Sequence, residues 1–195
     1  RGMGLDGRIG RKFLHAGPGF GGSCFPKDTR ALVLTAEEVG APTRLVEAVV
    51  AVNENRKRAM AQRVVRVCGG SVAGKTIGVL GVTFKPNTDD VRESVSLTVI
   101  PLLQEAGATI RAYDPAGMEE AAKHLSHVTW CRDAYDVASG SDALLLLTEW
   151  NEFRGLDLAR LLAAMRAPVI IDTRNALKLD AKQFPHVVYD AVGKG

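Results

Sequence analysis

The sequence of 195 residues contains few cysteines and no long apolar run, and these absences exclude whole classes of protein. No run approaches the roughly 20 residues that cross a bilayer, and Ala143–Leu147 predicts a buried strand instead. No signal peptide is visible, and the three scattered cysteines form no CxxC pair. The four histidines lack the spacing of zinc ligands. We therefore expect a protein of the reducing cytoplasm that holds no metal.

An excess of charge of one sign is also missing. The 25 Lys and Arg residues are interleaved with 22 Asp and Glu residues, which leaves a net charge of +3. No basic block predicts contact with nucleic acid or with a membrane surface. Hydrophobic residues make up 46% and charged residues 24% of the chain, a mixture typical of globular proteins. The dispersed cations remain available for an anionic small molecule.

The pattern of apolar residues divides the chain into two regions, 1–70 and 71–195. After a glycine-rich opening, the first region predicts a helix over Lys27–Val39 and a longer one over Arg44–Cys68, with Thr43 as its N-cap. The second helix is longer than a small domain needs. It fits the core of a helical bundle and a connecting or dimer-forming helix about equally well.

The second region alternates short aliphatic runs with amphipathic stretches, which predicts βαβ units on a parallel sheet. Pro101 is expected to delay or kink the first helix of this region. The predicted fold class is α/β, a helical region followed by a Rossmann-like sheet. The expected strands are Thr76–Val82, Thr109–Tyr113, Ala143–Leu147 and Val169–Ile171, and the expected helices are 95–106, 117–125, 133–139 and 156–165.

Such sheets bind their ligands at the carboxyl ends of the strands. The corner Gly78-Val79-Leu80-Gly81 lacks a GxGxxG fingerprint, so the second region alone does not predict dinucleotide binding. The residues expected at this edge are Lys85, Asp114, Thr148-Glu149-Trp150 and Asp172-Thr173-Arg174.

The segment from Gly17 to Asp28 carries the strongest chemical signal in the sequence. Its glycines allow close backbone approach to a ligand and leave N–H groups free for oxygen atoms. Cys24 follows them at the start of the predicted helix, where the helix dipole and the adjacent Lys27 favour a thiolate. A lone cysteine is more often a small buried hydrophobe, but this setting reverses that preference. Cys68 and Cys131 have no such setting, and we interpret them as structural.

Three further features contribute charge. Asp28 lies one helical turn after Cys24, where it can activate a water molecule near a thioester or simply complement the helix dipole. Residues 84–94 (FKPNTDDVRES) offer cations after the first strand, although a solvated turn closed by Asp–Arg pairing is an alternative. Residues 8–14 (RIGRKFL) place three cations around an apolar patch, and a lone charge run of this kind is more often a solvated face.

Taken together, these segments resemble the UDP-glucose dehydrogenase family, within the wider group of UDP-glucose and GDP-mannose dehydrogenases. The resemblance runs from Arg8 to Arg174, and the cysteine motif GFGGSCFPKD over 19–28 is its most specific part. The other matching segments follow in the family's order: Arg8-Ile9-Gly10, Gly81 with Phe84-Lys85, Asp90-Val91-Arg92-Glu93-Ser94, Tyr113-Asp114-Pro115, Thr148-Glu149-Trp150 and Asp172-Thr173-Arg174.

The resemblance implies a homodimer that oxidises UDP-glucose to UDP-glucuronate with NAD. Cys24 would be the nucleophile that forms a thiohemiacetal and then a thioester, and Asp28 would assist the water and proton transfers. Arg8 would reach the substrate of the partner subunit. The substrate-binding residues implied are Arg8, Phe13, Leu14, Gly17, Phe20, Gly21, Phe84, Lys85 and Arg174, and the NAD-binding residues are Lys27 and Arg92.

One departure from the family limits this expectation. In the family, a Rossmann domain with a glycine fingerprint precedes the residue that Arg8 matches and supplies most of the NAD site, and no such domain is visible here. We therefore expect 1–70 to be a central helical dimerisation region with the cysteine loop, 71–195 to be a C-terminal UDP-sugar-binding domain, and the chain to be inactive alone.

Other functions remain open. A GDP-mannose or another nucleotide-sugar dehydrogenase is one alternative, and a non-catalytic nucleotide-sugar-binding or dimerisation module is a second. A cysteine hydrolase is disfavoured because no histidine is placed as a general base.

Overall fold

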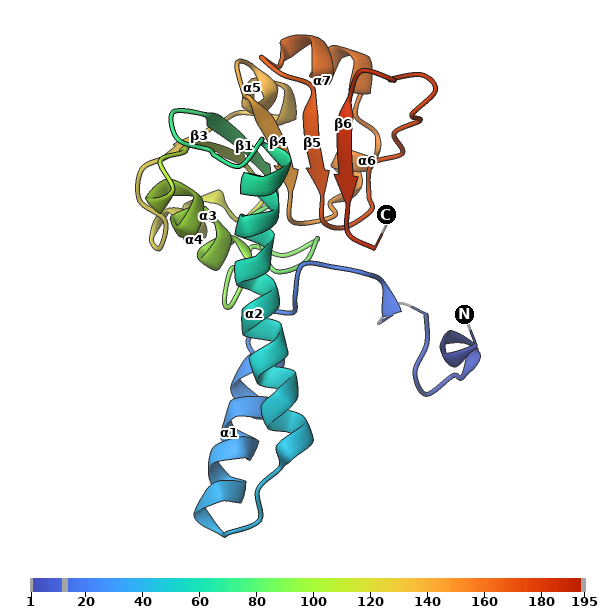
Figure 1. Cartoon of the computed structure of the whole chain (residues 1–195). Helices are drawn as coiled ribbons and strands as arrows, with labels where there is room; N and C mark the ends of the chain where they lie inside the picture. Colours follow the sequence, from blue (N-terminus) through green and yellow to red (C-terminus); the bar gives the residue numbers. More distant parts are fainter. Residues whose placement is uncertain (1, 12–13, 194–195) are drawn as a thin grey trace.

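A six-stranded parallel sheet and a long helical hairpin make up the protein (Figure 1). The computed structural model describes residues 2–11 and 14–193. After a 3-10 helix over Met3–Leu5, the helices are α1 Phe25–Glu38, α2 Arg44–Val67, α3 Ser96–Glu105, α4 Met118–Ala122, α5 Ala134–Ala138, α6 Asn151–Arg154 and α7 Leu158–Ala164. The strands are β1 Thr76–Leu80, β2 Thr109–Tyr113, β3 Val128–Trp130, β4 Ala143–Leu146, β5 Val169–Asp172 and β6 Val188–Ala191. The predicted α/β class is confirmed.

The strands lie in the order β3-β2-β1-β4-β5-β6, and every neighbouring pair is parallel. This is the doubly wound order of a Rossmann-like sheet, in which the chain returns to the centre after β3 and continues on the other side. Val79 of β1 is paired with Ala112 of β2 and with Leu145 of β4. The carboxyl ends of β1 and β4 therefore meet where the strand order reverses, and such sheets bind ligands at this point.

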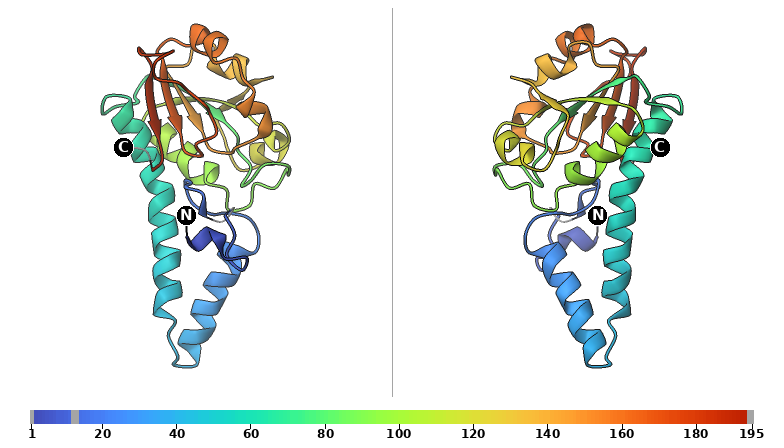
Figure 2. Two further views of the ribbon diagram at one scale, coloured as in Figure 1. Left: turned by 90° about the vertical axis from the view of Figure 1, so that its right-hand side faces the viewer. Right: turned by 90° about the vertical axis from the view of Figure 1, so that its left-hand side faces the viewer.

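Helices cover both faces of the sheet, as the two views in Figure 2 show. On one face, α2, α3 and α4 pack over β1, with Val64, Leu103 and Val79 completely buried. On the other face, α5, α6 and α7 pack over β4, with Phe153 and Leu144 completely buried. Burial on both faces explains why β1 and β4 are continuous apolar runs rather than alternating ones.

The hairpin of α1 and α2 projects from the sheet, and α2 continues along it (Figure 1). The buried apolar residues of α2, Met60, Ala61 and Val64, all lie in its second half. Leu45 and Val52, in the first half, are 85% and 64% exposed. Only the second half of α2 is therefore a core helix. In the described part of the chain, no helix combines the length and apolar character needed to cross a bilayer.

An ion pair ties α2 to the edge of the sheet. Arg63 Nε donates to Asp190 Oδ1 at 2.9 Å, and Arg63 Nη2 donates both to that carboxylate and, at 3.0 Å, to the carbonyl oxygen of Ala191. Both acceptors belong to β6, and the two charged side chains are 20% and 17% exposed. These partly desolvated bonds fix the direction of the hairpin relative to the sheet.

Some elements differ from the sequence prediction. The edge strands β3 and β6 and the short helix α6 are not predicted by the apolar pattern, because the strands are short and their side chains only partly buried. Pro101 lies inside α3, which begins at Ser96 without delay. Thr43 does precede α2, but its hydroxyl forms no capping hydrogen bond.

Asp114 was expected at the ligand-binding edge, but its side chain is a buried structural link. Its Oδ2 accepts hydrogen bonds from Val82 N at 2.7 Å, Thr83 N at 3.1 Å and Trp150 Nε1 at 3.1 Å. Its Oδ1 accepts from Gly117 N at 2.8 Å. Asp114 therefore holds the loops after β1, β2 and β4 together, and its carboxylate is fully engaged within the protein.

Replacing Asp114 with alanine should strongly destabilise the fold. The change leaves several buried N–H donors without an acceptor, and each such donor costs about 1–3 kcal/mol. We expect D114A to lower the free energy of unfolding by about 3 kcal/mol or more, measured by urea denaturation. The control D89A removes an exposed carboxylate from the loop between β1 and α3 and should change this free energy by less than about 0.5 kcal/mol. Equal effects of the two variants would contradict the structural role.

Candidate active site

Cys24 lies at the N-terminus of α1 and is exposed to solvent. Its carbonyl oxygen accepts a hydrogen bond from Asp28 N at 2.8 Å, and its Sγ lies 3.6 Å from Ser23 Oγ. The helix begins at Phe25, two residues earlier than predicted, and Pro26 occupies its first turn, where a missing N–H costs little. The thiol therefore lies at the positive end of the helix dipole.

Two cations interact electrostatically with this thiol, and one of them is paired with a carboxylate. Lys27 Nζ lies 2.7 Å from Asp28 Oδ1, and both side chains are largely exposed. Asp28 is the main cause that raises the pKa of Lys27, and Cys24 adds a smaller effect in the same direction. The pKa of Arg92 is raised mainly by Asp90 and to a smaller extent by Cys24. Lys27 and Arg92 thus both lie within electrostatic reach of Cys24, one from α1 and one from the loop between β1 and α3.

Gly21 and Gly22 form the contact between the cysteine loop (residues 17–24) and the loop between β1 and α3. Gly22 has a φ of 88°, and its N–H donates to the carbonyl oxygen of Arg92 at 2.8 Å. A Cβ on Gly21 would lie 2.3 Å from Glu93 O, and one on Gly22 would lie 2.8 Å from the ring of Phe84. Glycine is therefore required at both positions, because any side chain would separate the two loops.

The helix α2 holds the other side of the cysteine loop. Asn53 Oδ1 accepts from Phe20 N at 2.9 Å, and Asn53 Nδ2 donates to Phe20 O at 3.1 Å. Arg56 Nε donates to Gly17 O at 2.6 Å. The rings of Phe20 and Phe25 also meet edge to face, with centroids 5.1 Å apart. The loop is thus fixed between α2 and the loop after β1.

An ionic cluster of Arg30, Glu54, Lys57 and Glu93 joins α1, α2 and the loop between β1 and α3. Arg30 Nη1 and Nη2 donate to the two carboxylate oxygens of Glu93 at 2.8 and 3.1 Å, and Nη2 also donates to Glu54 at 3.2 Å. Lys57 Nζ lies 3.4 Å from both carboxylates, although its side chain is only 2% exposed. Arg30 is the main cause that lowers the pKa of Glu93. Each of the two cations in the cluster therefore contacts both carboxylates.

Arg174 follows β5 and reaches across the carboxyl edge of the sheet. Its Nε donates to Leu147 O at 2.7 Å and lies 3.1 Å from Glu149 Oε2. Its Nη2 donates to Phe84 O at 3.4 Å, and its Nη1 would lie 3.2 Å from a Cβ on Gly17. Burial lowers the pKa of Arg174, and Glu149 opposes this effect. Arg174 thereby connects the loops after β1 and β4 with the cysteine loop.

Lys85 is exposed at the same edge, and its Nζ lies 5.2 Å from the centroid of the Phe84 ring. Asp172, also expected there, is buried and accepts hydrogen bonds from Arg174 N at 3.0 Å and from Tyr189 OH at 3.0 Å. Its role is structural, like that of Asp114. The predicted residues that the fold gathers around this edge are Cys24, Asp28, Lys27, Gly17, Phe20, Gly21, Phe84, Lys85, Arg92 and Arg174.

The predicted residues near the N-terminus lie elsewhere. Arg8 is paired with Asp6 at 2.7 Å, and its side chain is 89% exposed. Leu14 is exposed as well. Figure 1 shows that this segment extends away from the hairpin and the sheet. Phe13 lies outside the described residues.

Sequence reasoning assigned no role to four residues that hold the site in place: Asn53, Lys57, Arg30 and Glu93. A signal was present for the first two, because Asn53 and Lys57 lie on the helical face that continues with Met60, and all three are buried in α2. Polar residues on a buried face must find partners inside the protein. The pairing of Arg30 with Glu93 depends on the fold and left no such signal.

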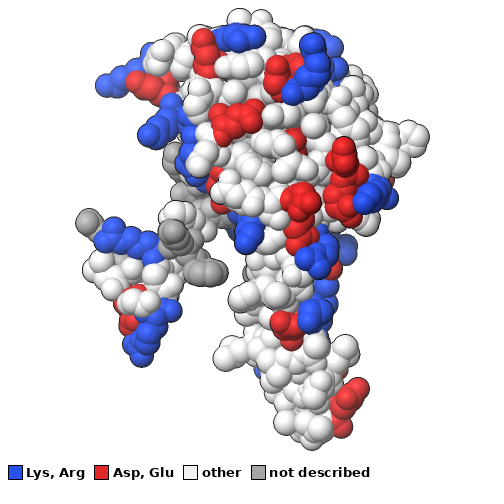
Figure 3. All heavy atoms as spheres, turned by 180° about the vertical axis from the view of Figure 1, so that it is seen from behind, with Lys and Arg blue, Asp and Glu red and all other residues white. Residues whose placement is uncertain are grey.

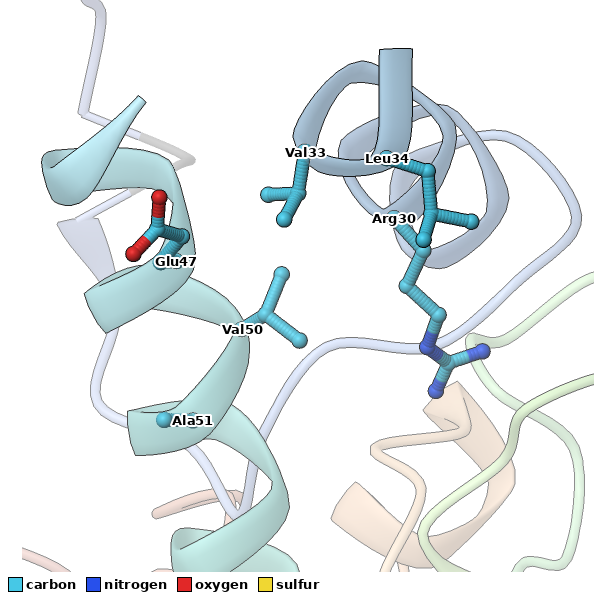
Figure 4. A pocket seen from close by; sticks show the side chains of 6 residues that line it. All are labelled: Arg30, Val33, Leu34, Glu47, Val50 and Ala51. Atoms are coloured by element: carbon cyan, nitrogen blue, oxygen red, sulfur yellow. The ribbon is translucent and has the colours of Figure 1, made fainter. Parts of the chain in front are cut away.

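A separate groove lies between α1 and α2 (Figure 4). Its lining is mostly apolar and includes no cysteine, serine or histidine, so it offers no nucleophile. We interpret it as part of the hairpin's packing surface and not as a site of chemistry. The lining residues are Arg30, Val33, Leu34, Glu47, Val50 and Ala51.

Comparison with known proteins assigns the chain to a family. Residues 78–179 match the UDP binding domain of the UDP-glucose/GDP-mannose dehydrogenase family, and residues 1–55 match that family's central domain. The chain is 54% identical over 194 residues to a UDP-glucose 6-dehydrogenase of Rhizobium meliloti, a match that covers 100% of the chain and 44% of the relative. It is 46% identical over 194 residues to the UDP-glucose 6-dehydrogenase TuaD of Bacillus subtilis, a match that covers 99% of the chain and 42% of the relative. The chain spans less than half the length of these relatives.

A solved structure agrees with these matches. The UDP-glucose dehydrogenase of the hyperthermophilic archaeon Pyrobaculum islandicum matches with a TM-score of 0.84 and 38% identity, over 100% of this chain and 42% of that one. The match therefore includes both the hairpin and the sheet. The protein is a member of the UDP-glucose/GDP-mannose dehydrogenase family.

Proposed function

We propose that this chain carries the nucleophile of an enzyme that oxidises UDP-glucose to UDP-glucuronate with NAD. The observation that supports this most directly is the exposed Cys24 at the N-terminus of α1, with Lys27 and Arg92 beside it. The names of the relatives in Rhizobium meliloti and Bacillus subtilis favour UDP-glucose over GDP-mannose. We infer that the chain acts within a longer protein, as these relatives are more than twice its length.

Cys24 would form and release the covalent intermediate. Its thiolate attacks the aldehyde carbon of the half-oxidised sugar to form a C–S bond, while the carbonyl oxygen takes up a proton. Loss of a hydride and a proton converts this thiohemiacetal to a thioester. Water then attacks the thioester carbon and gives up its two protons, one to a nearby base and one to solvent. The C–S bond breaks, the carboxylate product leaves, and Cys24 returns to its thiolate form. The positive end of α1 stabilises negative charge on the sulfur at both ends of this sequence.

Asp28 would assist the water. It lies on α1 one turn after Cys24, and its carboxylate is 64% exposed and bound to Lys27 at 2.7 Å. A carboxylate in this position can accept a proton from a water molecule that approaches the thioester. Lys27 would orient that carboxylate.

The residues of this chain fit only a small part of an NAD site. A Cβ on Gly81 would lie 2.5 Å from Thr148 Cβ, so the loop after β4 packs directly against the corner at which a Rossmann sheet holds a dinucleotide. Lys27 and Arg92, in contrast, have side chains that are 73% and 67% exposed and would bind anionic phosphates. When bound, NAD would accept the hydrides that this oxidation releases.

The sugar nucleotide would bind at the carboxyl edge beside the cysteine loop. Arg174 is held by Leu147 and Glu149 through its Nε, and its outer guanidinium nitrogens lie beside Phe84 O and Gly17, two residues of the proposed substrate site. Lys85 provides a second, exposed cation for the diphosphate. Phe84, Gly17, Phe20 and Gly21 would complete the substrate site. Arg8 would act in a partner subunit, and Phe13 and Leu14 stay predictions.

Cys24 should be the fastest-reacting thiol of the chain. Cys68 and Cys131 are 9% and 5% exposed, and burial raises the pKa of both thiols, so less of each is thiolate at neutral pH. We expect iodoacetamide to alkylate Cys24 at least about tenfold faster than either of these two cysteines. Mass spectrometry of the peptide that contains each cysteine measures the three rates. Equal rates at Cys24 and Cys68 would favour the non-catalytic module instead.

Calorimetric titration should show binding of UDP-glucose to the chain in preference to GDP-mannose. Removing the cation in K85Q should weaken binding about tenfold, or about 1.4 kcal/mol. The control K123Q removes Lys123, a cation that follows α4 and pairs with Glu120, and should leave binding unchanged. Preferential binding of GDP-mannose would reassign the substrate.

With UDP-glucose and NAD added, we expect the chain to produce no NADH, and NADH production would contradict the need for a further domain.

We also propose that the hairpin forms a homodimer. Contiguous exposed apolar surface marks protein interfaces, and few charges lie at the end of the hairpin on the face shown in Figure 3. The same surface can instead be covered by the rest of a longer chain. Besides Phe25 at the start of α1, the large exposed apolar residues of the hairpin are Leu32, Leu34, Val39, Leu45, Val49 and Val52.

Sedimentation velocity distinguishes these two arrangements. We expect the chain to sediment as a dimer and the double variant L34E/V52E to sediment as a monomer, because a buried unpaired charge at an interface is costly. The control V188E places a charge on β6, where Val188 is 50% exposed, and should remain dimeric. A monomeric parent chain would contradict the dimer.

A further inference from the structure

Glu93 occupies an unusual backbone position in the loop between β1 and α3. Its φ is 54°, in the left-handed region that a residue with a long side chain seldom adopts. Such a conformation costs free energy and persists where the surroundings impose it. Here the carboxylate is held by both terminal nitrogens of Arg30, at 2.8 and 3.1 Å, and by Lys57 at 3.4 Å. The side chain is thus anchored at once to α1 and to α2.

The anchored residue lies directly against the glycines that precede Cys24. The carbonyl oxygen of Glu93 packs on Gly21, where a Cβ would be only 2.3 Å away. The preceding carbonyl, that of Arg92, accepts the N–H of Gly22 at 2.8 Å. The backbone conformation at Glu93 therefore sets where Gly21 and Gly22 lie.

We propose that Glu93 is a positioning residue for Cys24. It touches no reacting atom and acts through Gly21 and Gly22, whose places it fixes by its bonds to Arg30 and Lys57. The inference rests on the proposed role of Cys24 as nucleophile. Arg30 lies in α1, the helix that begins directly after Cys24, so a single carboxylate ties the loop before the thiol to the helix after it.

The chain offers a matched control in Glu54. Its carboxylate contacts the same two cations, Arg30 at 3.2 Å and Lys57 at 3.4 Å. Glu54 lies on α2, however, and so does not connect these cations to the loop between β1 and α3. Replacing Glu54 with glutamine removes the same charge from the same cluster and leaves the anchor of the loop in place.

Amide hydrogen exchange measured by NMR tests the positioning directly. In E93Q the N–H of Gly22 should exchange about tenfold faster, because the carbonyl that accepts it is no longer held. The N–H of Phe20, which donates to Asn53, should keep its rate. E54Q should leave both rates within about twofold of the parent chain. R30Q, which removes the side chain that binds both carboxylate oxygens of Glu93, should reproduce the effect of E93Q.

Alkylation of the three cysteines gives the chemical readout. In E93Q we expect Cys24 to react with iodoacetamide about threefold more slowly, as the carbonyl of Arg92 no longer holds Gly22 and with it the loop that presents the thiol. Cys68 and Cys131 should remain as slow as in the parent chain. Unchanged Gly22 exchange in E93Q, or an equal effect in E54Q, would overturn the proposal. Faster alkylation of Cys68 and Cys131 in E93Q would also overturn it, by showing that Glu93 serves overall stability.

Failure of the proposed function has a different signature. If Cys24 reacts no faster than Cys68 in the parent chain, the nucleophile assignment fails whatever E93Q does. If Cys24 is fast in the parent chain and E93Q leaves Gly22 exchange unchanged, only the positioning role fails.

Discussion

The backbone contact of Gly21 and Gly22 with the loop between β1 and α3 determines where Cys24 lies relative to the sheet. A Cβ at Gly21 would lie 2.3 Å from the carbonyl oxygen of Glu93, so the two chain segments approach too closely for any side chain at this position. This approach brings a thiol from the helical part of the chain to the carboxyl edge of the sheet. The loop between β1 and α3, which carries Lys85 and Arg92, then meets a thiol that belongs to another part of the sequence.

The contact persists because α2 supports it from behind. A helix that buried only apolar residues could pack on the sheet but could not hold a polar backbone loop. Asn53 and Lys57 are 6% and 2% exposed, and burial of such groups is unfavourable unless they are hydrogen-bonded or paired. Asn53 satisfies the backbone of Phe20, and Lys57 meets two carboxylates. The buried polar residues of α2 therefore allow this helix to hold the cysteine loop in place as well as to pack on the sheet.

Carboxylates and cations of the shared family segments take different roles according to burial. Asp114 and Asp172 are buried, and their oxygens accept hydrogen bonds from the loops that follow the strands. They set the shape of the binding edge. Lys85 and Arg92 remain exposed in the loop after β1, and Lys27 remains exposed at the start of α1. Residues that look equally functional in the sequence are thus divided between buried structural links and exposed charges.

The sequence by itself determined the α/β class, the two long helices, the four central strands and the position of Cys24 before a helix. These features are local: apolar periodicity, glycine punctuation and residue spacing are contained in short windows of sequence. The tertiary structure alone decided that β3 and β6 join the sheet as edges, that the first half of α2 is exposed, and that Asp114 is buried. It also decided that Arg30 and Glu93, far apart in the sequence, form one ion pair. Such contacts depend on the packing of distant elements, because a charge has no intrinsic partner until folding places one within reach.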